Sequence, residues 1–264
     1  MSRGRPRGRF AARGATALAA LACAAACAQA DAQEPPSVTP YRPSVSTPAE
    51  LSAPGYLEFE LGALQTPAPQ RRDSLPYAAK LAFDEDWGLR VAGEAWVRTR
   101  DAAGAVRSGA GDTSVVLKHR LDLDELSALG VELGWQIPTG RAGLGAGTAA
   151  ATVNAIYSRD VGAAHIDINL NATRNDVTLP ATGRVATGWA AALSRALDER
   201  WEVCGEVSGM NQRGPGSASQ ALAALSYTVS RALVLDAGLA ASLHAGSAGP
   251  SIFFGFTALG PRLF

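Results

Sequence analysis

Apolar and polar residues alternate along much of the chain, with the period of two that is typical of a half-buried β-strand. Residues 201–207 and 233–239 are the clearest examples. In the first of them, Glu206 falls on one face and Val207 on the other. A soluble β-sandwich turns its apolar face inward, whereas a membrane barrel turns that face to lipid and keeps the polar face in its lumen. The pattern predicts an all-β protein and leaves these two architectures open.

Twelve segments of the chain read as strands. Most of them are close to the 9–11 residues that a tilted membrane strand needs. An even number of antiparallel strands leaves both ends of the barrel on the same side of the membrane. We predict strands at 55–65, 75–83, 88–99, 110–120, 127–137, 147–158, 163–174, 184–195, 200–211, 217–229, 232–243 and 249–264.

The connections between these strands alternate in length. The tight ones are 84–87, 122–126, 159–162, 196–200 and 230–231. The longer ones, rich in Gly, Pro, Ser or charge, are 66–74, 100–109, 138–146, 175–183, 212–216 and 244–248. This alternation is typical of outer-membrane barrels, whose short turns are periplasmic and whose long loops are extracellular.

Aromatic residues collect at the tight-turn or terminal ends of the predicted strands. They are Tyr56, Phe83, Trp87, Tyr157, Trp201, Tyr227 and Phe264, with Trp135 near the opposite ends. Aromatic rings gather where a membrane meets water. A soluble sandwich has no reason for such a girdle, so we predict a transmembrane antiparallel β-barrel of about twelve strands. Its last strand, ending at Phe264, should close the barrel against residues 56–61.

The first 30 residues have the features of a secretory signal peptide. Five arginines precede an uncharged Ala/Leu-rich run over residues 15–26, and residues 28–30 fit the small-x-small cleavage pattern. The run is too short to span a bilayer comfortably, so we expect cleavage near Ala30 rather than an uncleaved anchor. No mature segment is long and apolar enough for a transmembrane helix, which leaves a barrel as the membrane-spanning form.

Residues 31–54 contain six prolines, which exclude helix and ladder pairing over most of the segment. We interpret it as a flexible periplasmic leader. The alternative is a segment that threads into the lumen as a plug. The barrel is predicted to cover residues 55–264.

The charge balance and the cysteine count exclude two features, a nucleic-acid partner and an internal disulfide. The whole chain has 24 basic and 24 acidic residues, and removal of the signal leaves 19 basic against 24 acidic, a net charge of −5. An acidic balance argues against a nucleic-acid partner. Cys204 is the one cysteine after residue 30, so the mature chain forms no internal disulfide.

Several segments resemble a known family of outer-membrane proteins. They are residues 40–46, 48–55, 111–113, 116–120, 188–195 and 227–231. The chain resembles the outer-membrane transporter family of the phenol meta-pathway degradation type over about residues 40–264. The resemblance implies a barrel with a transport role in a context of aromatic degradation, and it specifies neither a substrate nor a catalytic motif. Pro261 departs from the usual terminal strand of that family.

Strand parity places thirteen charged residues in the lumen, because a charge facing lipid would be costly. These lumen candidates are Glu58, Glu60, Lys80, Arg90, Glu94, Arg98, Lys118, Arg120, Glu132, Asp167, Glu202, Glu206 and Asp236. In one interpretation they pair across neighbouring strands and fill a narrow barrel. In the other they set a transverse field that filters polar or anionic solutes.

The sequence predicts no catalytic or metal site. His119, His165 and His244 lie on separate predicted strands without a carboxylate or cysteine at ligand spacing. A barrel phospholipase needs a His–Ser pair, but Ser114 has the opposite parity to His119. The glycines of residues 143–147 lack a following Lys-Ser/Thr and form an external loop.

We therefore predict an outer-membrane barrel of a Gram-negative bacterium that acts as a passive channel for uptake or efflux of small solutes, aromatic compounds among them. It needs no cofactor and is not an enzyme. Its partners are outer-membrane lipid, a small-molecule solute and the barrel-assembly machinery. A structural or adhesion-like barrel with a filled lumen is the alternative, and the phospholipase is a third.

Overall fold

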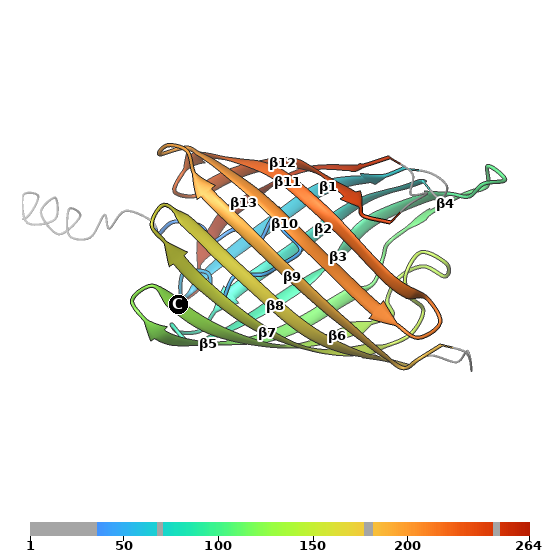
Figure 1. The fold of residues 1–264 in the computed structure, drawn as a ribbon, viewed down its shortest axis with the longest axis horizontal. Coiled ribbons are helices and arrows are strands. Elements are labelled where there is room, and N and C mark those ends of the chain that lie inside the picture. Colours follow the sequence, from blue (N-terminus) through green and yellow to red (C-terminus); the bar gives the residue numbers. More distant parts are fainter. Residues whose placement is uncertain (1–35, 68–70, 177–181, 245–248) are drawn as a thin grey trace, which may run out of the picture. The chain divides into compact units, whose positions relative to one another are not determined.

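Thirteen β-strands account for the regular structure of the described part of the chain (Figure 1). The structure, a computed structural model, describes residues 36–67, 71–176, 182–244 and 249–264. Within these residues no helix is long and apolar enough to cross a bilayer. The strands are β1 (Tyr56–Thr66), β2 (Arg71–Ala82), β3 (Trp87–Arg100), β4 (Val106–Gly109), β5 (Thr113–Asp124), β6 (Ser127–Ile137), β7 (Ala150–Val161), β8 (Ala164–Asn175), β9 (Val185–Ala196), β10 (Trp201–Gln212), β11 (Gly216–Ser230), β12 (Leu233–Ser242) and β13 (Ser251–Arg262).

Twelve of these strands form a closed antiparallel barrel. Each pairs with the barrel strands before and after it, and β1 pairs with both β2 and β13, so the barrel has no free edge. β4 is a short extra strand that pairs with the far end of β3, inside a connection that was predicted as a loop. The prediction of a twelve-stranded barrel is confirmed. β2 begins at Arg71 and β5 ends at Asp124, so these two boundaries were wrong by four residues each.

The closing seam lies between β1 and β13. Phe59 is opposite Ala258 in the register, and the pairing continues to Gln65 opposite Ile252. The register shifts between Tyr56 and Glu58, beside Pro261, whose missing N–H fits an irregular ladder end. The closing pair predicted from the sequence is confirmed, and Pro261 lies within the strand.

The two faces of the sheet have opposite polarity. Val203, Val207, Leu235 and Leu239 are exposed, as are many other large apolar side chains on the outer surface. Most of the buried charged side chains lie on the inner surface at alternate positions, Glu206 among them. Apolar surface of this extent would be buried in a soluble protein, so the outer surface is suited to lipid.

Aromatic rings mark both rims of the barrel. We call the rim with the tight connections the turn end and the other rim the loop end. At the turn end the Trp201 and Tyr227 rings lie 4.6 Å apart between centroids, and Trp87 stacks on His119 at 4.3 Å. At the loop end Trp135 is exposed together with Trp96 and Trp189, which were not singled out from the sequence.

Residues 36–54, here called the lumen segment, do not form a free leader. The compact unit of the fold begins at Pro36, and backbone atoms of this segment bond to inward side chains of the barrel. The leader interpretation was wrong for these residues. Proline removes the segment from the ladder, as expected, but several of its remaining N–H and C=O groups bond to side chains inside the barrel. The predicted signal peptide lies outside the described residues.

Candidate functional site: lumen segment and solute cavity

Tyr41 is the centre of the lumen segment. Its ring is buried between two ammonium groups, with Lys80 Nζ 4.0 Å and Lys118 Nζ 4.2 Å from the ring centroid. Its hydroxyl donates to the carbonyl of Glu50 at 2.7 Å and accepts from Lys118 at 2.9 Å. Cation–π contacts gain strength when the cation is desolvated, so this stack ties the segment to β2 and β5.

Two carboxylates of β1 accept hydrogen bonds from backbone N–H groups of the lumen segment near Tyr41. Glu58 accepts from Thr39 N at 2.9 Å, and Glu60 accepts from Tyr41 N at 2.7 Å. Lys80 pairs with both carboxylates, so two buried acids share one cation. Buried charges are tolerated where they are paired and hydrogen-bonded. The lumen segment provides some of the hydrogen bonds that these carboxylates need.

Arg42 is held in a slot made by two glycines. Its guanidinium pairs with Asp236 of β12 through two bonds of 3.1 and 3.0 Å. A Cβ placed on Gly62 would lie 2.5 Å from Arg42 Nη1, and one on Gly255 would lie 2.7 Å from Nε. A side chain at either of these inward positions would push the guanidinium away from its present place beside Asp236.

The second half of the segment bonds to the opposite wall. One oxygen of Glu206 accepts from the backbone N–H groups of Val45 and Ser46, both at 2.8 Å. The Asn169 amide pairs with both backbone groups of Thr47, accepting from N at 3.0 Å and donating to O at 2.9 Å. These bonds cross the lumen from the β1 side to β8 and β10.

Twelve of the thirteen lumen candidates lie on the inward parity of their strands. Seven of them bond directly to the lumen segment: Glu58, Glu60, Lys80, Lys118, Glu132, Glu206 and Asp236. Glu132 accepts from Thr47 Oγ1 at 3.3 Å and pairs with Arg90 at 3.5 Å. Asp167 accepts from Ser158, which in turn accepts from Ala49 N at 2.7 Å.

Three candidates lie farther toward the rims. Glu94 pairs with Arg72 near the loop end. Arg120 pairs with Asp122 at 2.7 Å near the turn end, and Glu202 is exposed at the start of β10.

The prediction for Arg98 was wrong. Leu75 is opposite Trp96 and Pro76 is opposite Glu94, so Ala95 is an extra residue in β3. This bulge reverses the parity of the remaining residues of β3, and Arg98 becomes exposed opposite Asp73. Alternation read from sequence carries no mark of a bulge.

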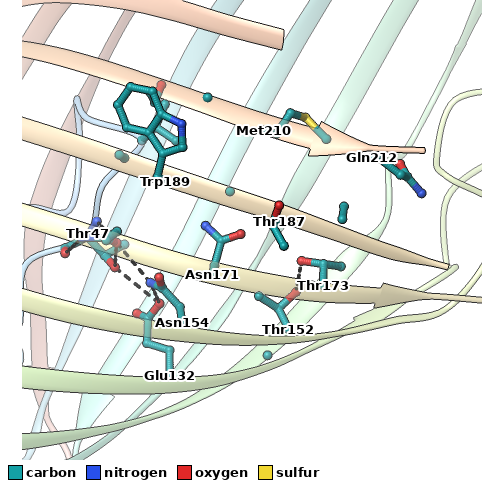
Figure 2. Close-up of a pocket in the computed structure, with 18 of the residues that line it drawn as sticks. Thr47, Glu132, Thr152, Asn154, Asn171, Thr173, Thr187, Trp189, Met210 and Gln212 are labelled. Atoms are coloured by element: carbon teal, nitrogen blue, oxygen red, sulfur yellow. Dashed lines mark hydrogen bonds between the residues drawn. The ribbon is translucent and has the colours of Figure 1, made fainter. Parts of the chain in front are cut away.

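A cavity of about 740 Å³ occupies the half of the barrel toward the loop end (Figure 2). Its inward side chains are mostly uncharged amides and hydroxyls from neighbouring strands. Figure 2 shows Asn171 and Thr173 projecting into this space, and Thr152 and Thr173 share a hydrogen bond of 2.8 Å. Glu132, Arg90 and Thr47 line it where it meets the lumen segment.

This lining was missed from the sequence because only charged residues were taken as lumen candidates. The missed residues are Thr152, Asn154, Asn169, Asn171, Thr173 and Gln212. A pattern that predicts this wall was present in the sequence. Polar Asn169, Asn171 and Thr173 alternate with apolar Leu170 and Ala172. Inward alternation of amides and hydroxyls predicts a polar wall as surely as alternation of charges.

Asp112 anchors the connection between β6 and β7 beside the loop-end rim. It accepts from Gly140 N at 2.9 Å, Ala146 N at 2.7 Å and Gln136 Nε2 at 2.9 Å. Partial burial acts to raise the pKa of Asp112, but these hydrogen bonds to its charged form outweigh it, so its pKa lies below the ordinary value. The connection is therefore folded, with Leu144 buried in it.

The phospholipase constellation is not assembled in the described residues. Ser114 Oγ donates to Ala92 O at 3.2 Å, while His119 Nδ1 contacts Asp86 O at 3.2 Å at the other end of β5. Five residues of extended strand separate them by roughly 16 Å. No described serine or threonine hydroxyl bonds to a histidine ring.

Solved structures with a similar fold include two outer-membrane barrels. An outer membrane channel from Pseudomonas putida F1 matches with a TM-score of 0.66 and 12% identity, covering 84% of this chain and 100% of that one. The KdgM porin matches with a TM-score of 0.55 and 8% identity, covering 76% of this chain and 98% of that one. The fold is that of an outer-membrane β-barrel. No family model and no curated protein matches the sequence.

Proposed function

We propose that this barrel is a passive channel of the outer membrane for small, uncharged organic solutes. The observation that carries the proposal is the division of the lumen: a cavity lined by amides and hydroxyls toward the loop end, and charges bound to the lumen segment toward the turn end. Both solved barrels compared above are described as a channel or a porin. By the usual orientation of such barrels, the cavity faces outward.

The lining favours solutes that carry hydroxyl or carbonyl groups. Amide and hydroxyl side chains offer both hydrogen-bond donors and acceptors but no charge to pair with an ion, so they match neutral polar groups better than ions. A small phenol or other aromatic compound with one polar group would fit a cavity of about 740 Å³, as the resemblance to a phenol-pathway transporter family implies.

Solute passage requires the lumen segment to give way. Its bonds to Glu60, Asp236 and Glu206 hold it across the turn-end half of the lumen. This observation favours the second candidate function, a structural barrel with a filled lumen.

Single-channel recording in planar bilayers separates the two. For the channel, the refolded mature chain should show brief, discrete conducting steps, and a variant lacking residues 36–50 should show longer and larger ones, because the plug is gone. Absence of steps in both proteins would favour the filled barrel.

Liposome swelling tests the solute class. Neutral solutes of equal size should enter faster than anions through the truncated variant. Equal rates for charged and neutral solutes would contradict the uncharged preference. The parent protein should fractionate with outer membranes and migrate differently on gels with and without heating; recovery from the soluble periplasm would overturn the location.

A further inference from the structure

His165, Asp167 and Glu50 bring three potential metal-ligand atoms together at the turn end. Asp167 Oδ1 lies 3.2 Å from His165 Nε2, and Glu50 Oε2 lies 3.9 Å from the same nitrogen. The three ligand atoms all lie within 4.8 Å of one another. His165 and Asp167 are two residues apart on β8, so both point inward, whereas Glu50 comes from the lumen segment.

Glu50 Oε2 is buried and accepts no hydrogen bond from any described residue. A buried carboxylate oxygen without a donor is costly, and a cation between it and His165 would satisfy it. The three side chains are only partly exposed, so water and ions can reach the cluster.

The surrounding hydrogen bonds orient the ligands. Asp160 contacts His165 Nδ1 at 2.6 Å, an arrangement that leaves Nε2 free for a metal once its own proton is displaced. Ser158 is almost fully buried, donates to Asp167 and accepts from Ala49 N at 2.7 Å. This serine fixes Asp167 and places the residue before Glu50.

We propose that these three residues form a site for a divalent transition-metal ion of the Zn²⁺ class. A histidine nitrogen with two carboxylate oxygens is a donor set that Zn²⁺ accepts, whereas Ca²⁺ and Mg²⁺ prefer oxygen alone. Ligand bonds of about 2.0–2.2 Å in a tetrahedron require ligand atoms roughly 3.3 Å apart. The pair at 3.2 Å meets this spacing, and the pair at 3.9 Å needs a small movement of Glu50.

The site joins two parts of the protein that the sequence separates by more than a hundred residues. Spacing along the chain therefore contained no hint of it, and the expectation of no metal site rested on spacing alone. A bound ion would fasten the end of the lumen segment to β8, which adds a metal-dependent tie to the bonds described above. The proposal does not depend on what the channel carries.

The test uses the full mature chain, refolded in detergent and freed of metal with a chelator. Titration with Zn²⁺, followed by calorimetry and by metal analysis after desalting, should show one equivalent bound. Co²⁺ should bind competitively and give the visible absorption of a tetrahedral site. His165→Ala should abolish binding, Glu50→Gln should weaken it, and Asp160→Asn should weaken it by about 10–100-fold through the lost orienting bond.

His244→Ala and His119→Ala serve as matched controls, since both histidines lie outside the cluster, and both should keep one equivalent. Heat-modifiable migration on gels verifies that each variant is folded. Zn²⁺ should also slow hydrogen exchange at residues 46–50 in the parent protein. In His165→Ala, Zn²⁺ should leave the exchange rates at these residues unchanged. Failure of the folded parent to bind micromolar Zn²⁺, or equal binding by His165→Ala, would overturn the proposal.

Discussion

At the scale of single residues, the side to which a side chain points decides what a change there does. Val207 and Ser208 are neighbours on β10, yet Val207 is exposed on the outer face and Ser208 lines the cavity. Lipid and water thus contact adjacent residues of one strand.

Val207→Arg should destabilise the folded barrel in lipid vesicles by about 2–4 kcal/mol, because its charge would face the hydrocarbon near the middle of the strand. Ser208→Arg is the matched control, since the same side chain would face the aqueous cavity and should reduce conductance with a smaller loss of stability. Denaturant unfolding in vesicles measures both. Equal losses would show that the two positions are not on opposite faces.

Asp112 provides a pH-dependent contact at the loop end. Its pKa is lowered in the folded protein, so its bonds to Gly140 and Ala146 stabilise the loop above the ordinary carboxyl value of about 3.9 and are lost as the pH falls through the lower, folded value. Hydrogen exchange at these two amides, corrected for intrinsic rates, should accelerate in that acidic window.

Asp112→Asn should remove this pH response. It should also speed exchange at neutral pH by roughly tenfold or more, because a hydrogen bond to a charged group contributes about 1.5–3 kcal/mol. An unchanged acidic response in Asp112→Asn would assign the effect to another group.

At the scale of elements, the lumen segment and the barrel wall are fitted to each other. The segment has no regular secondary structure, so its position depends on inward carboxylates, amides and small residues contributed by β1, β8, β10, β12 and β13. A change in the wall can therefore release the segment.

Gly62→Ala should loosen the lumen segment, because the new methyl would lie 2.5 Å from the Arg42 guanidinium. Gly134→Ala is the matched control, since the nearest atom to its new methyl would be 3.6 Å away. Exchange at the amides of Tyr41, Val45 and Ser46 should accelerate in the first variant and stay at parental rates in the second. The same rates in both variants would contradict the slot assigned to Arg42.

At the scale of the whole molecule, closure by β1 and β13 removes both sheet edges, which a bilayer demands because lipid offers no hydrogen-bond partners. The seam joins segments about 200 residues apart, so it forms only when every intermediate strand has its register.

Cysteines at Phe59 and Ala258, in a Cys204→Ser background, should form a disulfide across this seam. The two residues are directly opposite in the register, and Cα atoms of such pairs lie about 4.5–5.5 Å apart, within disulfide range. The oxidised protein should stay compact on gels after boiling. Cysteines at Phe59 and Thr257, one residue out of register, should not cross-link. Cross-linking of the second pair alone would mean that the seam is shifted.

Local patterns along the chain are sufficient to predict the barrel architecture. Alternation with a period of two, tight and longer connections in turn, and aromatic residues at strand ends are local properties of the chain, and together they predict the barrel, its closing pair and the face of nearly every charge. Val207 and Glu206 could be assigned in this way because strand geometry alone sets their directions.

What fills the lumen depends on contacts that form only in the folded protein. The lumen segment has no periodicity, so nothing local shows that Arg42 meets Asp236 or that Glu50 meets His165. The bulge at Ala95 turned Arg98 outward for the same reason, since it exists only in the pairing with β2. Contacts between residues far apart along the chain depend on three-dimensional proximity. These contacts divide the barrel into a polar cavity and a region where the lumen segment bonds to the wall.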